Sequence, residues 1–168
     1  MNTYFLLTTV ALFALTFYTA ELCLANRQIP PSLSASVFFL PPSGAWIWTL
    51  TMAIMVFCLA PVLIATASES LQWCAFLACA GLLFVGGAPL VKNKTDMAYR
   101  VHCSAAVVCA VSAMILVIAT RWWLAFGWLP WLYWFIWQTR DRRWRTQTFW
   151  AEMTCFGLTF LHAYLNIV

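Results

Sequence analysis

Charged residues are what this sequence has least of. Only 8% of its 168 residues are Asp, Glu, Lys or Arg, whereas hydrophobic residues make up 64%. Soluble domains contain about 25% charged and roughly 45–50% apolar residues, so a water-soluble core could not absorb this excess. Spans of about 20 residues, the length that a ~30 Å hydrocarbon core requires, would use most of the chain, and we expect no appended soluble domain.

The familiar catalytic and ligand-binding motifs are also missing. The sequence has no Walker loop, no GxSxG elbow, no HExxH and no GxGxxG. Its seven cysteines lie within apolar runs and lack the CxxC spacing of a zinc ribbon, which argues against a metal centre and against a disulfide framework. The basic surface is too small for a nucleic-acid partner. We therefore expect no metal, no cofactor and no nucleic acid.

Long apolar runs predict an all-α fold, a polytopic transmembrane helical bundle of about six helices that forms a single domain over residues 1–168. The first run has no basic n-region and no A-x-A cleavage site, so it is interpreted as a retained helix rather than a signal peptide. Polar or Pro-rich breaks place the helices near residues 3–24, 45–67, 70–91, 101–120, 122–138 and 148–167.

The predicted helix at 122–138 differs from the others. It is short, contains Pro130 and includes six tryptophans. Tryptophan favours the two interfaces of a bilayer, so the segment is interpreted as a short span anchored at both ends and facing lipid.

Basic residues predict an orientation. If both termini face outside, only Arg121 lies on the outer side, and the other basic residues obey the positive-inside rule: Arg27, Lys92, Lys94, Arg100, Arg140, Arg142, Arg143 and Arg145. In a bacterium the protein would lie in the cytoplasmic membrane.

The connection at residues 26–44 has proline pairs at 30–31 and 41–42, which exclude a regular helix across it. Its apolar centre, Val37 to Leu40, fits a segment that lies at the membrane interface. A plain surface loop is the alternative.

Ionisable groups within a span are costly and are therefore candidates for function. Glu21, His102 and Glu152 fall at helix ends that share one membrane face, and the loop residue Asp96 could join them. Such a site could bind a polar head group, transfer protons or hold a metal ion. Alternatively, the carboxylates lie at the headgroup level and His102 bonds a neighbouring helix.

The last predicted helix concentrates its polar residues on one stripe. Glu152, Cys155, Thr159, His162 and Asn166 recur at offsets of 0, 3, 7, 10 and 14 residues. His162 lies roughly 15 Å beyond Glu152 at 1.5 Å per residue, too far to share its site. Small residues mark the predicted helices at 70–91 and 101–120. These two and the last helix are expected to form the packed centre.

Several short motifs suggest a family. Pro31-Ser32-Leu33-Ser34-Ala35, Phe84-Val85-Gly86-Gly87-Ala88-Pro89 and His102 before Ser104-Ala105-Ala106 resemble the layout of DRAM-like six-helix membrane proteins. Ala35 stands where that family commonly has an acidic residue, and the family's orientation is opposite to the charge-based one. The chain also resembles uncharacterised short multi-pass membrane proteins of bacteria and their phages, in which Phe149-Trp150-Ala151-Glu152 has a counterpart. The resemblance implies an association with membrane lipid and no catalytic residue.

The leading hypothesis is a non-enzymatic integral membrane protein that binds a lipid or amphipathic ligand, or a membrane partner, between the third, fourth and sixth helices. The partner could be another membrane protein or a second copy of the chain. Two alternatives remain open: a small proton-coupled transporter, and an intramembrane metal-dependent hydrolase or transferase.

Overall fold

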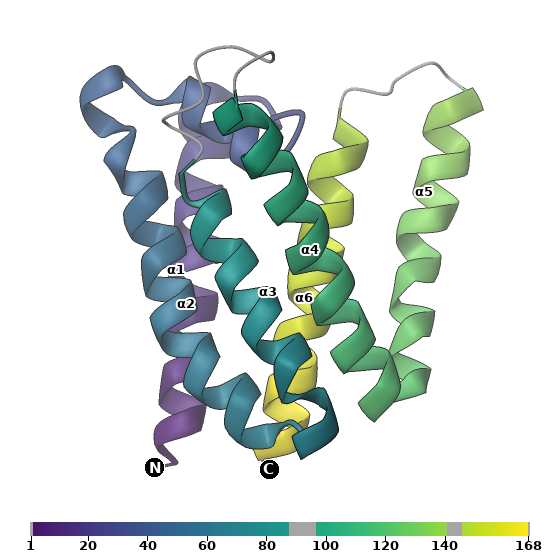
Figure 1. Ribbon diagram of the computed structural model, residues 1–168. Helices are drawn as coiled ribbons and strands as arrows, with labels where there is room; N and C mark the ends of the chain where they lie inside the picture. The colour runs from purple at the N-terminus through teal and green to yellow at the C-terminus, as the bar shows by residue number, and fades with distance from the viewer. Residues whose placement is uncertain (1, 88–96, 141–145, 168) are drawn as a thin grey trace.

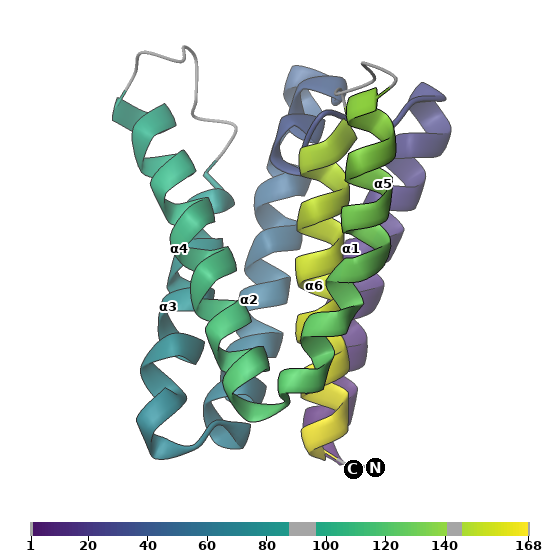
Figure 2. The same ribbon diagram turned by 90° about the vertical axis from the view of Figure 1, so that its right-hand side faces the viewer.

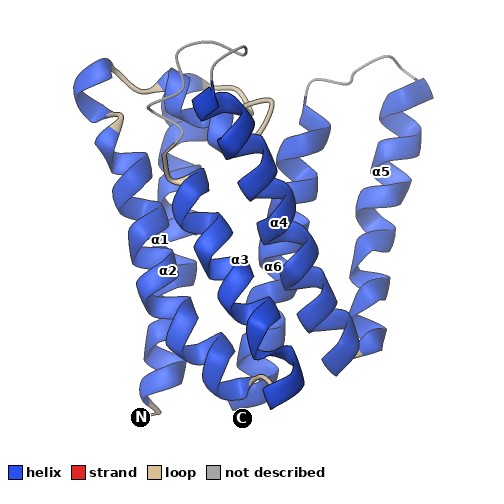
Figure 3. Ribbon diagram, in the orientation of Figure 1, coloured by secondary structure: helices blue, strands red, loops and turns tan. Residues whose placement is uncertain are grey.

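The computed structural model describes residues 2–87, 97–140 and 146–167, which fold as helices with short connections and no strand (Figure 3). The α-helices run alternately in opposite directions, so that the N- and C-terminal ends lie at the same end of the bundle (Figure 1). Their bounds are α1 Thr3–Asn26, α2 Trp46–Thr66, α3 Gln72–Val85, α4 Met97–Thr120, α5 Leu129–Arg140 and α6 Gln147–Ile167. Each predicted apolar run coincides with one of these α-helices, and the bounds differ as described below.

Among the described residues, three segments are long and apolar enough to cross a membrane: Thr3–Asn26, Pro42–Thr66 and Met97–Thr120. Glu69–Val85 forms a shorter apolar helix. α6 is long enough to span a membrane, but it is less apolar because it contains Gln147, Glu152, His162 and Asn166.

The segment between α1 and α2 folds back onto the bundle. α1 ends at Asn26, and the next residue, Arg27, has a left-handed φ of 52° that stops the helix. Two 3-10 turns follow, η1 at Ser34–Phe39 and η2 at Pro42–Gly44. Ser36 and Val37 are buried, and the Ser36 hydroxyl lies 2.7 Å from the Tyr18 hydroxyl of α1. The prolines exclude an α-helix here, as expected. At the centre of the segment Val37, Phe39 and Leu40 pack on the core, whereas Phe38 is 68% exposed.

The packed centre includes a helix that the sequence did not single out. α3 and α4 share the largest interface between described helices and lie side by side in Figure 2. However, α2 contributes the large buried side chains Trp48, Met52, Met55 and Val62. Small-residue stripes indicate where helices approach closely, but they do not reveal a centre filled by large side chains.

Two hydrogen bonds from α2 hold the C-terminal end of α3. Val85 is its last residue, and the indole Nε1–H of Trp48 donates to the Val85 carbonyl at 3.2 Å. The Thr49 hydroxyl donates to the Gly86 carbonyl at 2.9 Å. Residues 88–91 of the predicted third helix lie outside the described residues.

The continuous helix expected at 122–138 is wrong in its first half. Residues Trp122–Trp128 form a 3-10 turn (η5), and α5 begins at Leu129. Pro130 explains the break, because proline has no N–H to donate to the carbonyl four residues earlier but is well accommodated in a first helical turn. No side chain between Leu129 and Trp137 is buried, consistent with a helix at the periphery.

Candidate ligand-binding cavity

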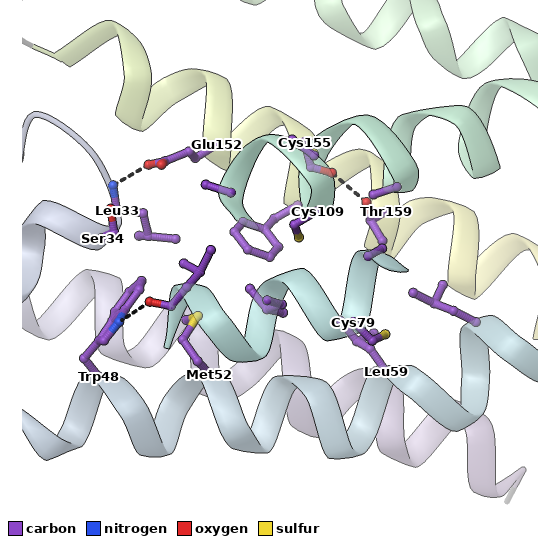
Figure 4. Close-up of a pocket in the computed structure, with 18 residues that line it drawn as sticks. Leu33, Ser34, Trp48, Met52, Leu59, Cys79, Cys109, Glu152, Cys155 and Thr159 are labelled. Carbon is purple, nitrogen blue, oxygen red and sulfur yellow. Dashed lines mark hydrogen bonds between the residues drawn. The ribbon is translucent and has the colours of Figure 1, made fainter. Parts of the chain in front are cut away.

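A cavity of about 80 Å³ lies inside the bundle, between η1 and the four helices α2, α3, α4 and α6 (Figure 4). Its lining is mostly apolar and comprises Leu33, Ser34, Trp48, Met52, Leu59, Leu63, Ala78, Cys79, Leu82, Val85, Ala106, Cys109, Ala110, Ala113, Glu152, Cys155, Phe156 and Thr159. We refer to it below as the cavity.

Helical spacing brings two stripes of the sequence to the cavity. On α4 the lining residues Ala106, Cys109, Ala110 and Ala113 are all small, so this helix leaves space rather than filling it. On α6, Glu152, Cys155 and Thr159 line the cavity on successive turns. The polar face predicted for the last helix therefore faces inward over these three residues.

Glu152 is the only Asp or Glu among the lining residues. Its Oε2 accepts a hydrogen bond from the backbone N–H of Leu33 (dashed in Figure 4). A second bond runs beside it, from the Phe149 N–H to the Pro31 carbonyl at 3.1 Å. Glu152 thus helps to fix the loop after α1 against the start of α6, while its other oxygen has no donor among the described residues.

Ser34 was not predicted as a site residue, yet it lines the cavity next to Leu33. Its hydroxyl lies 3.4 Å from the Ser32 hydroxyl, and the Ser32 hydroxyl accepts from the Ala35 N–H at 3.0 Å. The alternation of serines after the first proline pair is the one feature of the sequence that could have indicated this position.

The other residues expected at this site do not join it. His102 lies one turn before Ala106 on α4, is half-buried and does not line the cavity. Its Nδ1 is buried without a partner, and no hydrogen bond or ion pair joins it to Glu152 among the described residues. Glu21 is exposed on α1, and Asp96 lies outside the described residues. Of the described residues predicted for this pocket, Glu152 alone lines the cavity.

His162 and Asn166 belong to a separate polar cluster, as their distance along α6 predicted. His162 is fully buried, and the Asn166 amide nitrogen lies 3.2 Å from its Nδ1. The Arg121 guanidinium donates to the Leu165 carbonyl at 2.8 Å and to Asn166 Oδ1 at 3.3 Å. A cation that bonds the last carbonyls of a helix is favourable there, so this cluster has a structural explanation: it caps α6.

The cavity also collects three thiols, Cys79, Cys109 and Cys155, from three different helices. They are free cysteines. Within the described parts of the chain, no group of three His, Cys, Asp or Glu side chains is arranged to hold a metal ion. We therefore interpret the thiols as small, soft packing groups.

The arrangement can accommodate a narrow apolar group and can accept a hydrogen bond at one end. It brings together no acid–base pair. Comparisons with protein-family models, with curated proteins and with solved structures found no match.

Proposed function

We propose that this chain is an integral multi-pass membrane protein that binds a lipid or amphipathic ligand in the cavity. Its exterior supports a bilayer environment. Phe13, Phe57, Phe76 and Tyr133, on four different helices, are each exposed over more than 60% of their surface. Large apolar side chains are exposed on all six α-helices, and lipid tails would cover such an exterior.

The chain topology supports the same proposal. Three segments within the described part of the chain have the length and composition of spans, and the N- and C-terminal ends lie at the same end of the bundle (Figure 1). An even number of crossings follows if every helix spans. α3 and α5 are short, but a bilayer adapts to a short span by thinning locally, at a modest free-energy cost.

The observation on which ligand binding rests is Glu152 at one end of an otherwise apolar cavity. A carboxyl group within a membrane protein is costly and therefore suggests a function. Pockets that bind small molecules typically combine apolar walls with a few polar groups that set the orientation of the ligand. The Leu33 N–H occupies only one oxygen of Glu152.

The transporter and metal-enzyme alternatives receive less support. Proton transfer or metal binding would require ionisable side chains in contact with one another. Among the candidates that the structure describes at that end of the bundle, His102 and Glu152 form no such contact, and Glu21 is exposed.

Glu152→Gln tests the proposal. Glutamine keeps a carbonyl oxygen that can accept from Leu33, so we expect the variant to fold. Loss of the carboxylate should lower the amount of co-purified amphipathic ligand severalfold, measured by mass spectrometry of extracts from protein purified in detergent. His102→Ala is the matched control, because His102 lies at the same end of the bundle but outside the cavity.

Thermal unfolding of all three proteins would confirm that the fold is intact. If Glu152→Gln retained the wild-type ligand content, the proposed role of this carboxylate would be wrong.

A further inference from the structure

We propose that the cavity selects an amphipath with one unbranched apolar chain and a head group that donates hydrogen bonds, either a hydroxyl or an ammonium. This inference rests on the proposed function and names the chemical class of its ligand. Three features of the cavity support it: its shape, the polar atoms at its end, and the charges that line it.

The shape favours a single chain. On α2 the lining extends from Trp48 to Leu63, roughly 20 Å along the helix at 1.5 Å per residue. The volume over that length is only about 80 Å³, far below the ~300–1,000 Å³ of pockets for drug-sized ligands. A long space of so small a volume is narrow. It can hold methylene groups in single file, but not the two tails of a phospholipid.

Both N–H donors at the polar end are already used. The Leu33 N–H is already bonded to Glu152, and the Trp48 indole N–H to the Val85 carbonyl. What remains is an acceptor, the second carboxylate oxygen of Glu152, with the Ser34 hydroxyl beside it on the lining. A ligand head that donates hydrogen bonds would complete this end, and Ser34 can act as donor or acceptor to match it.

The charges oppose an anionic head. No Lys, Arg or His is present among the described residues that line the cavity. A fatty-acid carboxylate or a phosphate would therefore be buried beside the Glu152 carboxyl group without a neutralising cation, and burying an unpaired charge is costly. A neutral alcohol avoids this cost, and an alkylammonium pairs with the carboxylate.

The three head groups can be compared on one chain length. Octanol, octylamine and octanoate would be titrated into the wild-type protein in dodecyl maltoside, with binding measured by calorimetry and by the shift in the unfolding temperature. We expect saturable binding of octanol or octylamine, with octanoate at least tenfold weaker. Binding of octylamine but not octanol would show that the head group is an ammonium. Binding of octanol but not octylamine would show that it is a hydroxyl. Glu152→Gln should weaken the binding of octylamine at least tenfold and the binding of octanol by a smaller factor.

Two phenylalanine variants of α4 separate the two proposals. Ala110 lines the cavity, and Ala110→Phe should abolish binding of every ligand. Ala119 is exposed on the same helix, and Ala119→Phe should leave binding unchanged. If octanoate bound the wild type as well as octanol, and Ala110→Phe abolished both, the cavity would bind ligand but the head-group inference would be wrong. If no octyl ligand bound, or if Ala110→Phe had no effect, the proposed function would fail as well.

Discussion

Gly81 shows how closely two helices of this bundle approach each other. A Cβ added at Gly81 would lie 2.7 Å from the Ala105 carbonyl oxygen and 2.9 Å from the Cβ of Cys109. Both atoms belong to α4, and one is backbone, so neither can move aside as the end of a flexible side chain could. The contact between α3 and α4 therefore depends on the absence of a side chain at this position.

We predict that Gly81→Ala lowers the free energy of unfolding by about 1–3 kcal/mol, because the two helices must separate or shift. The unfolding midpoint in detergent would measure this. Gly157→Ala is the control, since a Cβ there would meet nothing within 4 Å. Its stability should be unchanged or slightly raised, because alanine favours a helix over glycine by up to about 1 kcal/mol. Equal midpoints for the two variants would contradict the close approach.

Individual site residues were only partly predictable from the sequence. Glu152 was predicted because a carboxylate in an apolar run is unusual. Its bond to Leu33 joins residues 119 positions apart, and no local pattern encodes such a pairing. His102 was expected beside Glu152 because both occur near helix ends on the same face. Sharing a membrane face does not determine which way a side chain points around its helix.

At the scale of elements, η1 matters because it closes the cavity at the Glu152 end. It is fixed to α1 by the buried bond between the Tyr18 and Ser36 hydroxyls, 2.7 Å long. Tyr18 also packs on Trp48, with ring centroids 5.5 Å apart. The position of this turn therefore depends on a few specific contacts rather than on its own helical propensity.

Tyr18→Phe and Ser36→Ala should each destabilise the protein, by about 0.5–1.5 kcal/mol, because each removes one partner of a buried hydrogen bond. The double variant should lose less unfolding free energy than the sum of the losses of the two single variants, since both substitutions break the same bond. Thermal unfolding of the four proteins in the cycle measures the difference. Strict additivity would show that the two hydroxyls do not interact.

Helix positions were predicted well, and helix ends less well. Apolar runs fix where a helix forms, because each run must satisfy its own backbone hydrogen bonds. The ends depend on particular residues instead. Pro130 shifted the start of α5 to Leu129, and a pair of bonds from α2 holds α3 where it ends at Val85.

At the scale of the whole molecule, the positions of the termini give a topological prediction. Because both lie at one end of the bundle (Figure 1), reporters fused to either terminus should report the same side of a bacterial inner membrane. The basic residues predict that this side is outside. A reporter that is active only outside the cytoplasm should then be active at both termini. A fluorescent protein that folds only in the cytoplasm should be fluorescent at neither terminus.

Opposite sides for the two termini would contradict the even number of crossings. Both termini inside would preserve that number but reverse the orientation, as the layout of the DRAM-like proteins implies. Composition alone predicted a membrane environment for this chain, but the order of helices around the cavity required the structure.

The bond between Leu33 and Glu152 also has a consequence for biosynthesis. Leu33 is synthesised 119 residues before Glu152. The Leu33 N–H therefore cannot bond to this acceptor until α6 has been made. One side of the cavity is likewise missing until α6 arrives with Glu152, Cys155 and Thr159. A nascent chain that stopped after α5 would expose the small residues of α4 to lipid, and the ability to hold a ligand would be acquired only once α6 has been made.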